Sequence, residues 1–316
     1  MGEQGPRGWI GSQLPEAAGH WRLPADVLAE LDAAVGELRR NPLPTVTLSP
    51  EEFALDRTRA FAADLRDELE HGYGFAIVDR LPLDRWSREE ASAAYWLLSA
   101  CLMRPVAQSW DGKLIYDVRD SGKPVGNGVR PDITNVEQNF HTDNSYNHCP
   151  PNVVGLLCVQ TAKQGGVSGL ISFRAAHDAM AERHPDLLAR LYQPFYFDRQ
   201  REHAPEDVMV THHPMFENRD GRLVARLSRR QVVNGYKLAG VPLDGAAHGA
   251  LEAFEAILEE PGRARNLVFA PGQIQYVNNL ALGHRRTRFE DWPEPERKRH
   301  LVRLWLRDSG RRGYGG

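Results

Sequence analysis

The pattern of secondary-structure signals changes near residue 113, and this change constrains the fold most. From there on, the chain consists of short β-prone segments separated by Gly, Pro and Asn. Many short strands in one region predict a β-sandwich or barrel, and helices in front of them predict an outer layer. We therefore predict a mainly β protein with helices, of the α+β class. The β-prone segments are residues 114–118, 153–159, 170–173, 195–197, 223–227, 267–269, 273–277 and 300–306.

Helical patterns occupy most of the chain before this point. Apolar side chains recur at three- and four-residue intervals in the first pattern, which is typical of an amphipathic helix. Ser49 and Ser87 each precede a Glu three residues later, and such capping boxes predict a helix start. A single further helix is predicted inside the β-rich part. The predicted helices cover residues 23–40, 50–71, a stretch from 87 onward, and 175–192, with a β-prone run at 75–78.

No linker divides the 316 residues, so we predict one domain over the whole chain, 1–316. Gly and Pro without a period suggest a flexible N-terminal segment over about residues 1–20 that frays or drapes over the body. A helical part follows over residues 23–110, and a β-rich core with a helical insert over residues 111–307.

Composition excludes several classes of partner. The formal net charge is −3, from 39 basic and 42 acidic residues, so no global field would attract nucleic acid or an anionic membrane. Cys101, Cys149 and Cys158 lack the spacing of a disulfide framework or a zinc site. The apolar stretches are far shorter than the ~20 residues of a membrane helix, and no signal peptide is recognisable. A cytoplasmic protein that binds a small molecule is expected.

The segment His141-Thr142-Asp143 is the first candidate site. On an extended strand, residues two apart point to the same face, so the imidazole and the carboxylate would lie together. Alone this triplet means little, because chance produces about one in a chain of this kind. A second His from a distant strand, for which His284 is the candidate, would complete a triad of two His and one carboxylate. Such a triad leaves open positions on the metal for reactants.

Arg299 and Arg303 form the second candidate feature. They lie four residues apart in the last β-prone segment and would share a face, while Val302, Leu304 and Leu306 occupy the apolar face. A guanidinium in a polar cavity is suited to bind a carboxylate in a bidentate manner. An Arg pair on a solvated strand edge explains the same spacing equally well, so both interpretations stay open at this point.

Several separated motifs resemble the taurine dioxygenase and 2,4-dichlorophenoxyacetate dioxygenase (TauD/TfdA-like) family of iron(II)- and 2-oxoglutarate-dependent oxygenases, over about residues 72–307. Residues 139–143, Asn-Phe-His-Thr-Asp, resemble its metal-binding motif. Residues 165–168, Gly-Gly-Val-Ser, resemble its Gly-Gly-x-Thr segment, with Ser in place of Thr. His284-Arg285-Arg286 resembles its distal His-x-Arg. The resemblance implies a double-stranded β-helix (jelly roll, cupin-like) core with an outer helical layer.

The same resemblance implies roles for individual residues. His141, Asp143 and His284 would hold Fe(II), and the Ser168 hydroxyl would bind a carboxylate of 2-oxoglutarate. Arg299 would pair with the distal carboxylate, while Arg303 would lie near the C1 end or near the substrate. With O2 as the other co-substrate, decarboxylation of 2-oxoglutarate would be coupled to hydroxylation of an unactivated C–H bond.

Alternatives to a hydroxylase remain open at this stage. Desaturation or cyclisation begins with the same hydrogen abstraction. A non-catalytic metal-binding jelly roll and an iron dioxygenase that uses no keto acid are competing hypotheses. The substrate expected is a small polar or anionic metabolite, such as an amino acid or an intermediate of specialised metabolism, and no pattern predicts a homo-oligomer interface.

Other polar residues receive weaker interpretations. His148, Asn139 and Asn278 are candidates to border the metal site or the substrate pocket. The basic run at residues 226–230 is interpreted as a solvated strand edge. The remaining histidines that attract attention are interpreted as surface or hydrogen-bonded core residues: His177, His212 and His213.

Overall fold

Two β-sheets form the centre of the protein in a computed structural model that describes residues 8–122 and 131–316. The larger sheet contains β1 (His20–Arg22), β2 (Phe75–Asp79), β14 (Ile274–Asn278), β6 (Val153–Gln160), β17 (His300–Arg307) and β3 (Arg104–Val106), and β4 (Tyr116–Val118) also pairs with β17. The smaller sheet contains β13 (Arg265–Leu267), β8 (Ser168–Ser172), β15 (Leu282–Arg286) and β5 (Gln138–His141).

Side chains of both sheets line one small pocket, so the sheets face each other across it. This arrangement agrees with the predicted α+β class and its jelly-roll core. Three pairs of short strands lie outside the two sheets: β9 (Phe195–Asp198) with β10 (Val210–His213), β11 (Phe216–Arg219) with β12 (Arg222–Ala225), and β7 (Gln164–Gly165) with β16 (Phe289–Glu290).

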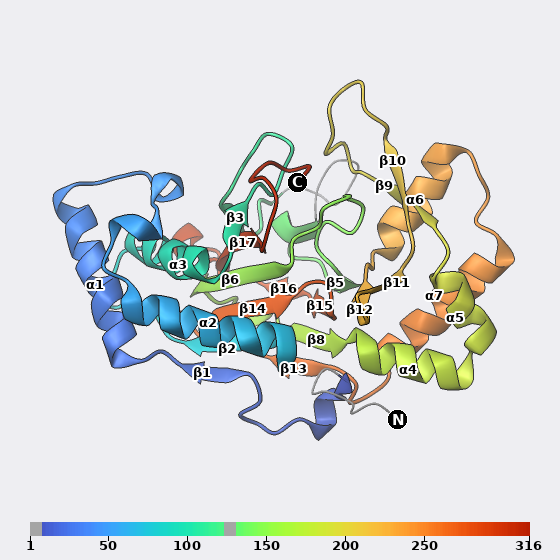
Figure 1. Cartoon of the computed structure of the whole chain (residues 1–316), viewed down its shortest axis with the longest axis horizontal. Helices are drawn as coiled ribbons and strands as arrows, with labels where there is room; N and C mark the ends of the chain where they lie inside the picture. Colours follow the sequence, from blue (N-terminus) through green and yellow to red (C-terminus); the bar gives the residue numbers. More distant parts are fainter. Residues whose placement is uncertain (1–7, 123–130) are drawn as a thin grey trace.

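Figure 1 shows the helices gathered at two sides of the molecule, with the strands between them. The first group covers the outer face of the larger sheet, where its apolar side chains pack on those of β6, β14 and β17. The second group follows β8 and β12 in the chain. The helices are α1 (Ala25–Arg40), α2 (Asp56–His71), α3 (Arg88–Leu102), α4 (Phe173–Arg183), α5 (Pro185–Leu191), α6 (Arg229–Ala239) and α7 (Gly245–Leu258).

A glycine allows α3 to approach the larger sheet closely. A Cβ atom on Gly155 of β6 would lie 2.3 Å from the Tyr95 hydroxyl oxygen, which no side chain tolerates. Tyr95 itself is fully buried. Beside it, the hydroxyls of Ser99 and Tyr276 form a 2.8 Å hydrogen bond between α3 and β14. The predicted helical layer is therefore joined to the sheet by packing and by a buried polar contact.

The two predicted capping boxes have different outcomes. At Ser87 the prediction is confirmed, because its hydroxyl accepts from the Glu90 amide and the Glu90 carboxylate accepts from the Ser87 amide. At Ser49 it is wrong, because the hydroxyl donates instead to the Glu51 carboxylate. A 3-10 turn, Pro50–Glu52, follows there, and α2 begins only at Asp56.

The prediction of a single helix in the β-rich part is also wrong. The expected helix over residues 175–192 is divided, because Pro185 cannot continue the hydrogen-bond ladder of α4 and instead begins α5. The helices α6 and α7 were not predicted. In α7 the buried side chains follow a helical period, but alanines occupy exposed as well as buried positions, which weakens the contrast between the two faces.

Some of the N-terminal residues that the structure describes pack against the body of the protein. Trp9 is 7% exposed and lies edge-on against Phe75, while its indole nitrogen donates to the Tyr73 carbonyl at 2.9 Å. Gly11 donates its amide to the Arg263 carbonyl. The segment from residue 8 onward thus drapes over the body, and residues 1–7 lie outside the described part. Among the described helices, none has the length and apolar character needed to cross a bilayer.

Candidate metal centre

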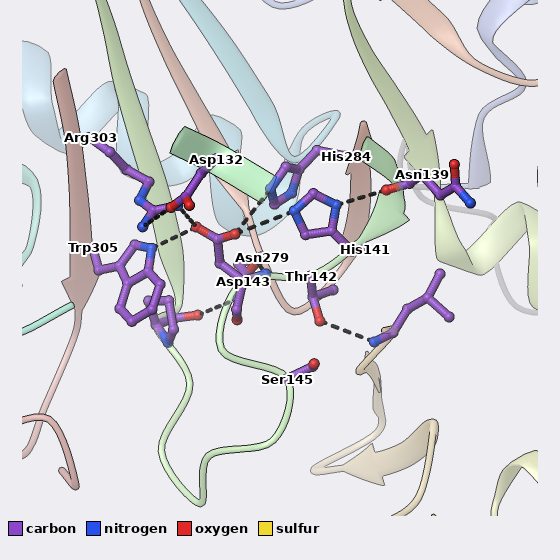
Figure 2. Close-up of polar contacts among 12 residues, drawn as sticks. Asp132, Asn139, His141, Thr142, Asp143, Ser145, Asn279, His284, Arg303 and Trp305 are labelled. Carbon is purple, nitrogen blue, oxygen red and sulfur yellow. Dashed lines mark hydrogen bonds and ion pairs between the residues drawn. The ribbon is translucent and has the colours of Figure 1, made fainter. Parts of the chain in front are cut away.

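Two neighbouring strands bring the two predicted histidines together. β5 and β15 pair antiparallel with His141 directly opposite His284, and the two ring centroids are 4.3 Å apart. Oδ1 of Asp143 lies 3.5 Å from His141 Nε2 and 3.4 Å from His284 Nε2 (Figure 2). One potential ligand atom from each residue lies within 4.8 Å of the others, which is compact enough to surround a single ion.

Asp143 reaches this cluster from a turn and not from a strand. β5 ends at His141, so the predicted strand geometry of the triplet is wrong although the two side chains do meet. The chain leaves β5 because Thr142 turns toward Leu227, where its amide donates to the carbonyl at 2.9 Å and its hydroxyl accepts from the amide at 3.1 Å. Asn279 then holds the next peptide, since its side chain accepts from the Asp143 amide and donates to the Asp143 carbonyl.

The carboxylate of Asp143 is oriented by donors on one side only. Its Oδ2 accepts from the Trp305 indole nitrogen at 2.7 Å and lies 3.2 Å from an Arg303 guanidinium nitrogen. Oδ1 is left facing the two imidazoles. His141 is oriented in turn by its Nδ1, which lies 2.8 Å from the Asn139 carbonyl. Such outer contacts set the orientation of metal ligands and raise metal affinity.

The protonation states of the cluster suit metal binding. Burial alone would raise the pKa of Asp143, but the Arg303 guanidinium and the two histidines hold that pKa well below its usual value. Burial lowers the pKa of His284, and the nearby His141 ring lowers it further. An ionised carboxylate and a neutral imidazole are the forms that bind a cation.

A small pocket of about 50 Å³ lies beside the cluster, between the two sheets. Ser168 and Arg299 both line it. The Ser168 hydroxyl donates to Gln275 Oε1 at 3.1 Å. Arg299 is only 5% exposed, and its Nη1 has no hydrogen-bond partner among the described residues. The solvated-edge interpretation of Arg299 is therefore wrong, because the guanidinium is buried beside the pocket.

Burial lowers the pKa of Arg299 to about 10, so the side chain is still a cation at neutral pH. The Gly-Gly pair of residues 165–168 makes room for it. Gly166 has φ +68°, and a Cβ atom there would approach Arg299 Nε to 3.1 Å. A Cβ atom on Gly165 would meet the Arg288 carbonyl oxygen at 2.2 Å. Gly165 is thus required by the close approach of the Arg288 backbone, and Gly166 by its positive φ together with the neighbouring Arg299 side chain.

Arg303 has most of its donors engaged within the protein. Besides Asp143, it contacts Asp132 Oδ2 at 3.1 Å through Nη2 and Gln108 Oε1 at 2.8 Å through Nε. It is 7% exposed, so the solvated-edge interpretation is wrong here too. The guanidinium stands at the junction of the small pocket and a second, larger cavity, which Arg303, Asp132 and Asp143 all line.

The larger cavity has a volume of about 590 Å³ and opens beside the metal-ligand cluster. Its wall combines the segment around β5 with the start of α6 and part of α7. Most of the residues that line it are polar, and they include Ser228, Arg230, Gln231 and Asn234 of the α6 side. Arg229, the first residue of α6, forms an ion pair of 2.6 Å with Glu255 of α7. A polar molecule larger than a free amino acid would fit this volume.

Sequence comparison supplies the family. A model of the family described as "Taurine catabolism dioxygenase TauD, TfdA family" matches residues 39–305. The chain belongs to the TauD, TfdA family. The resemblance inferred from the separated motifs is confirmed by this match.

FR-33289 synthase of Streptomyces rubellomurinus is 27% identical over 311 residues, covering 96% of this TauD-family chain and 90% of that protein. Uridine-5'-phosphate dioxygenase of Amycolatopsis is 31% identical over 157 residues, covering 49% of this chain and 55% of that protein.

Solved structures share the fold of this TauD-family protein. Asparagine oxygenase in complex with Fe(II), 3-hydroxyasparagine and succinate superposes with a TM-score of 0.68 at 19% identity, covering 92% of this chain and 94% of that one. The non-heme iron oxygenase OrfP in complex with Fe and alpha-ketoglutaric acid superposes with a TM-score of 0.66 at 15% identity, with the same coverage. At this identity the likeness concerns the fold.

In this TauD-family member, Asn139 lies beside the metal-ligand cluster, whereas Asn278 and His148 do not line either cavity. Asn139 contributes its carbonyl to His141 and lines the larger cavity. The Asn278 side chain lines neither cavity and instead donates to the Leu69 carbonyl at 2.9 Å. His148 is exposed, lines neither cavity and lies edge-on to His213.

The histidines set aside in the sequence have ordinary structural contacts. His177 lies 2.8 Å from the Tyr192 hydroxyl, and His212 lies edge-on to Tyr196. His213 is buried. None of these three lines either of the two cavities.

The basic run at residues 226–230 is not a solvated edge along its whole length. Arg226 is 3% exposed, and its guanidinium donates to backbone carbonyls of the turn that follows Asp143, including Ser145 at 3.1 Å. The prediction was wrong because the carbonyl groups that accept from Arg226 belong to a loop far away in the sequence, so residues 226–230 alone do not reveal them. Arg229 and Arg230 instead begin α6 at the cavity.

Sequence reasoning missed residues that support the candidate ligands. Trp305 had a usable signal, since it lies two residues after Arg303 on one strand and so shares its face. Asn279 is adjacent to the chosen Asn278, but no local pattern tells which of the two faces Asp143. The residues missed are Gln108, Asp132, Gln275, Asn279 and Trp305.

Proposed function

We propose that this chain is an Fe(II)- and 2-oxoglutarate-dependent dioxygenase that hydroxylates an unactivated C–H bond of a small polar metabolite. The observation that carries the proposal is the meeting of His141, Asp143 and His284, whose ligand atoms lie within 4.8 Å of one another. Beside them lies a pocket lined by the buried Arg299, whose Nη1 has no hydrogen-bond partner among the described residues. Membership of the TauD, TfdA family supports the same conclusion.

The donor set fits iron(II). Two imidazole nitrogens and one carboxylate oxygen from one side of an ion are the ligands of non-haem iron oxygenases, and they leave positions open for a bidentate co-substrate and O2. When bound, iron couples the oxidation of 2-oxoglutarate by O2 to insertion of one oxygen atom into the substrate C–H bond, with succinate and CO2 as co-products. The protein holds the ligands, orients the substrate carbon and excludes water.

Arg299 and Ser168 are proposed to bind 2-oxoglutarate. A buried guanidinium without a protein anion is an unfavourable state unless a ligand supplies the negative charge. A dicarboxylic acid does this with its distal carboxylate, and the Ser168 hydroxyl adds a hydrogen bond. Arg303 already binds Asp143 and Asp132, so we propose that it orients the metal ligand and borders the C1 end or the substrate.

The larger cavity is proposed to hold the substrate. Its polar lining favours an amino acid-like compound or a natural-product intermediate over a hydrocarbon. Desaturation or cyclisation would begin with removal of the same hydrogen atom, and product analysis decides between these outcomes. The three cysteines are free, which fits a reducing compartment, so a cytoplasmic location is part of the proposal.

Replacement of Arg299 by Ala tests the keto-acid dependence. Anaerobic titration of the iron-loaded protein should show that Arg299→Ala weakens 2-oxoglutarate binding by at least about 10-fold, because a charged hydrogen-bonded pair is lost. Arg297→Ala is a matched control, since Arg297 lies two residues away and its side chain is 48% exposed. Equal 2-oxoglutarate affinity and equal succinate release in wild type and Arg299→Ala would contradict the proposal.

A further inference from the structure

The last residues of the chain fold back beside the candidate metal centre. After β17, the chain passes β3, where the Ala107 amide donates to the Arg312 carbonyl at 2.9 Å, and Figure 1 shows the C terminus near β3 and β17. Tyr314 is 5% exposed. Its carbonyl accepts from the Asn147 side chain at 2.8 Å and from Arg307 at 3.0 Å. The segment is therefore docked by several contacts and does not hang free.

Tyr314 contacts two residues beside Asp143: its neighbour in the chain, Asn144, and its hydrogen-bond donor, Trp305. Its hydroxyl donates to Asn144 Oδ1 at 2.9 Å, and Asn144 directly follows Asp143 in the turn. The same hydroxyl lies 2.7 Å from that of Tyr146. Its ring stacks on Trp305 with centroids 6.5 Å apart and planes 25° apart, and Trp305 is the residue that donates to Asp143 Oδ2.

We infer that Tyr314 is a positioning residue of the metal centre, which holds Asn144 and Trp305 so that Asp143 presents Oδ1 to the two histidines. This inference rests on the proposed function, because it presupposes that His141, Asp143 and His284 bind a metal ion. The Tyr314 side chain itself touches none of these three ligands. Tyr314 would act through Asn144, which follows Asp143 in the chain, and through Trp305, which donates to the Asp143 carboxylate.

The backbone of Asn144 supports this role. Its φ is +57°, in the left-handed region that non-glycine residues adopt rarely and that asparagine adopts more readily than most of them. The Asn144 side chain is buried, and its Nδ2 has no hydrogen-bond partner among the described residues. The contact from Tyr314 to Oδ1 is thus the polar contact that fixes this side chain. Loss of the hydroxyl would let the turn relax and move Asp143.

Trp305 is held by two different contacts. One edge of the indole donates to Asp143, while the face of the ring lies against Tyr314. Stacked aromatic pairs favour one orientation of the rings. A larger change at position 314, such as Tyr314→Ala, would remove the stacking as well as the hydroxyl, and it would also leave a cavity. The conservative variant Tyr314→Phe therefore separates positioning from packing.

The decisive measurement is the affinity for Fe(II) alone, determined anaerobically by competition with a chromophoric chelator. Tyr314→Phe should bind Fe(II) about 10-fold more weakly than wild type, the lower end of the loss typical when an outer contact of a metal ligand is removed. Tyr276→Phe is the matched control, because Tyr276 is also buried and loses one hydroxyl hydrogen bond, to Ser99, in the helix-covered face of the larger sheet. The control should lose similar stability in urea and keep its Fe(II) affinity.

Equal Fe(II) affinity in Tyr314→Phe and wild type, together with lower stability, would overturn the inference and leave a structural role only. A second measurement does not depend on iron. In a crystal structure of metal-free Tyr314→Phe, we expect Asn144 to leave its left-handed conformation and the Trp305–Asp143 hydrogen bond to lengthen beyond hydrogen-bonding distance. An unchanged turn with that bond intact would overturn the inference even if the wild type bound no iron, in which case the proposed function would fail separately.

Discussion

The indole nitrogen of Trp305 donates a 2.7 Å hydrogen bond to Oδ2 of Asp143, while Oδ1 of the same carboxylate lies 3.4 Å from His284 Nε2. The carboxylate therefore has one oxygen held by the protein and one directed at the candidate metal position. A carboxylate free to rotate could instead offer both oxygens to the ion and occupy a position that a reactant needs. By holding Oδ2, the hydrogen bond from Trp305 keeps one more coordination position of the metal ion open for reactants.

Replacement of Trp305 by Phe should weaken Fe(II) binding by roughly 10- to 100-fold, because the donor to Oδ2 is lost while most of the ring packing is kept. The measurement is an anaerobic Fe(II) titration. Trp110→Phe is the control, since Trp110 is 50% exposed. If Trp305→Phe and wild type bound Fe(II) with equal affinity, the indole hydrogen bond would have no part in orienting Asp143.

Replacement of Ser168 by Ala should weaken binding of 2-oxoglutarate by about 5- to 10-fold, because one hydrogen bond of about 1 kcal/mol is lost. Ser168→Thr keeps the hydroxyl and should bind nearly as tightly as wild type. Both variants are compared by anaerobic titration of the iron-loaded protein. A loss in Ser168→Thr as large as in Ser168→Ala would show that space in the pocket matters and not the hydroxyl.

Stability should depend on pH through His213. Burial, together with the nearby Arg226 and His148, lowers its pKa to about 3. In the unfolded chain the pKa of a histidine is about 6.5, so between these values the unfolded state binds more protons than the folded state. The stabilisation is thus present above pH ~6.5 and is lost progressively as the pH falls toward 3.

His213→Gln should reduce this pH dependence, as measured by the urea midpoint at pH 7.5 and pH 5. The control is His248→Gln, because the side chain of His248 is 50% exposed on α7. Should His213→Gln lose as much stability between the two pH values as wild type, another group would be responsible for the acid sensitivity.

Much of the local structure follows from the sequence. The apolar period over residues 23–40 predicts α1 within two residues, and the capping box at Ser87 predicts the start of α3. These features depend on side chains a few residues apart, so a local pattern contains the information. The helix α6 escaped prediction because its apolar positions are few, and α7 because alanines occupy both its buried and its exposed positions. The capping box at Ser49 failed because a neighbouring carboxylate competed for the hydroxyl.

By itself, the sequence determined the residue types of the candidate site and the short spacing of His141 and Asp143. Only the tertiary structure decided that His284 pairs opposite His141, that Asn279 and not Asn278 holds the Asp143 peptide, and that Arg299 is buried beside the small pocket. The physical reason is that strand register and burial depend on contacts between segments far apart in the chain. Such contacts leave no periodic trace in either segment alone.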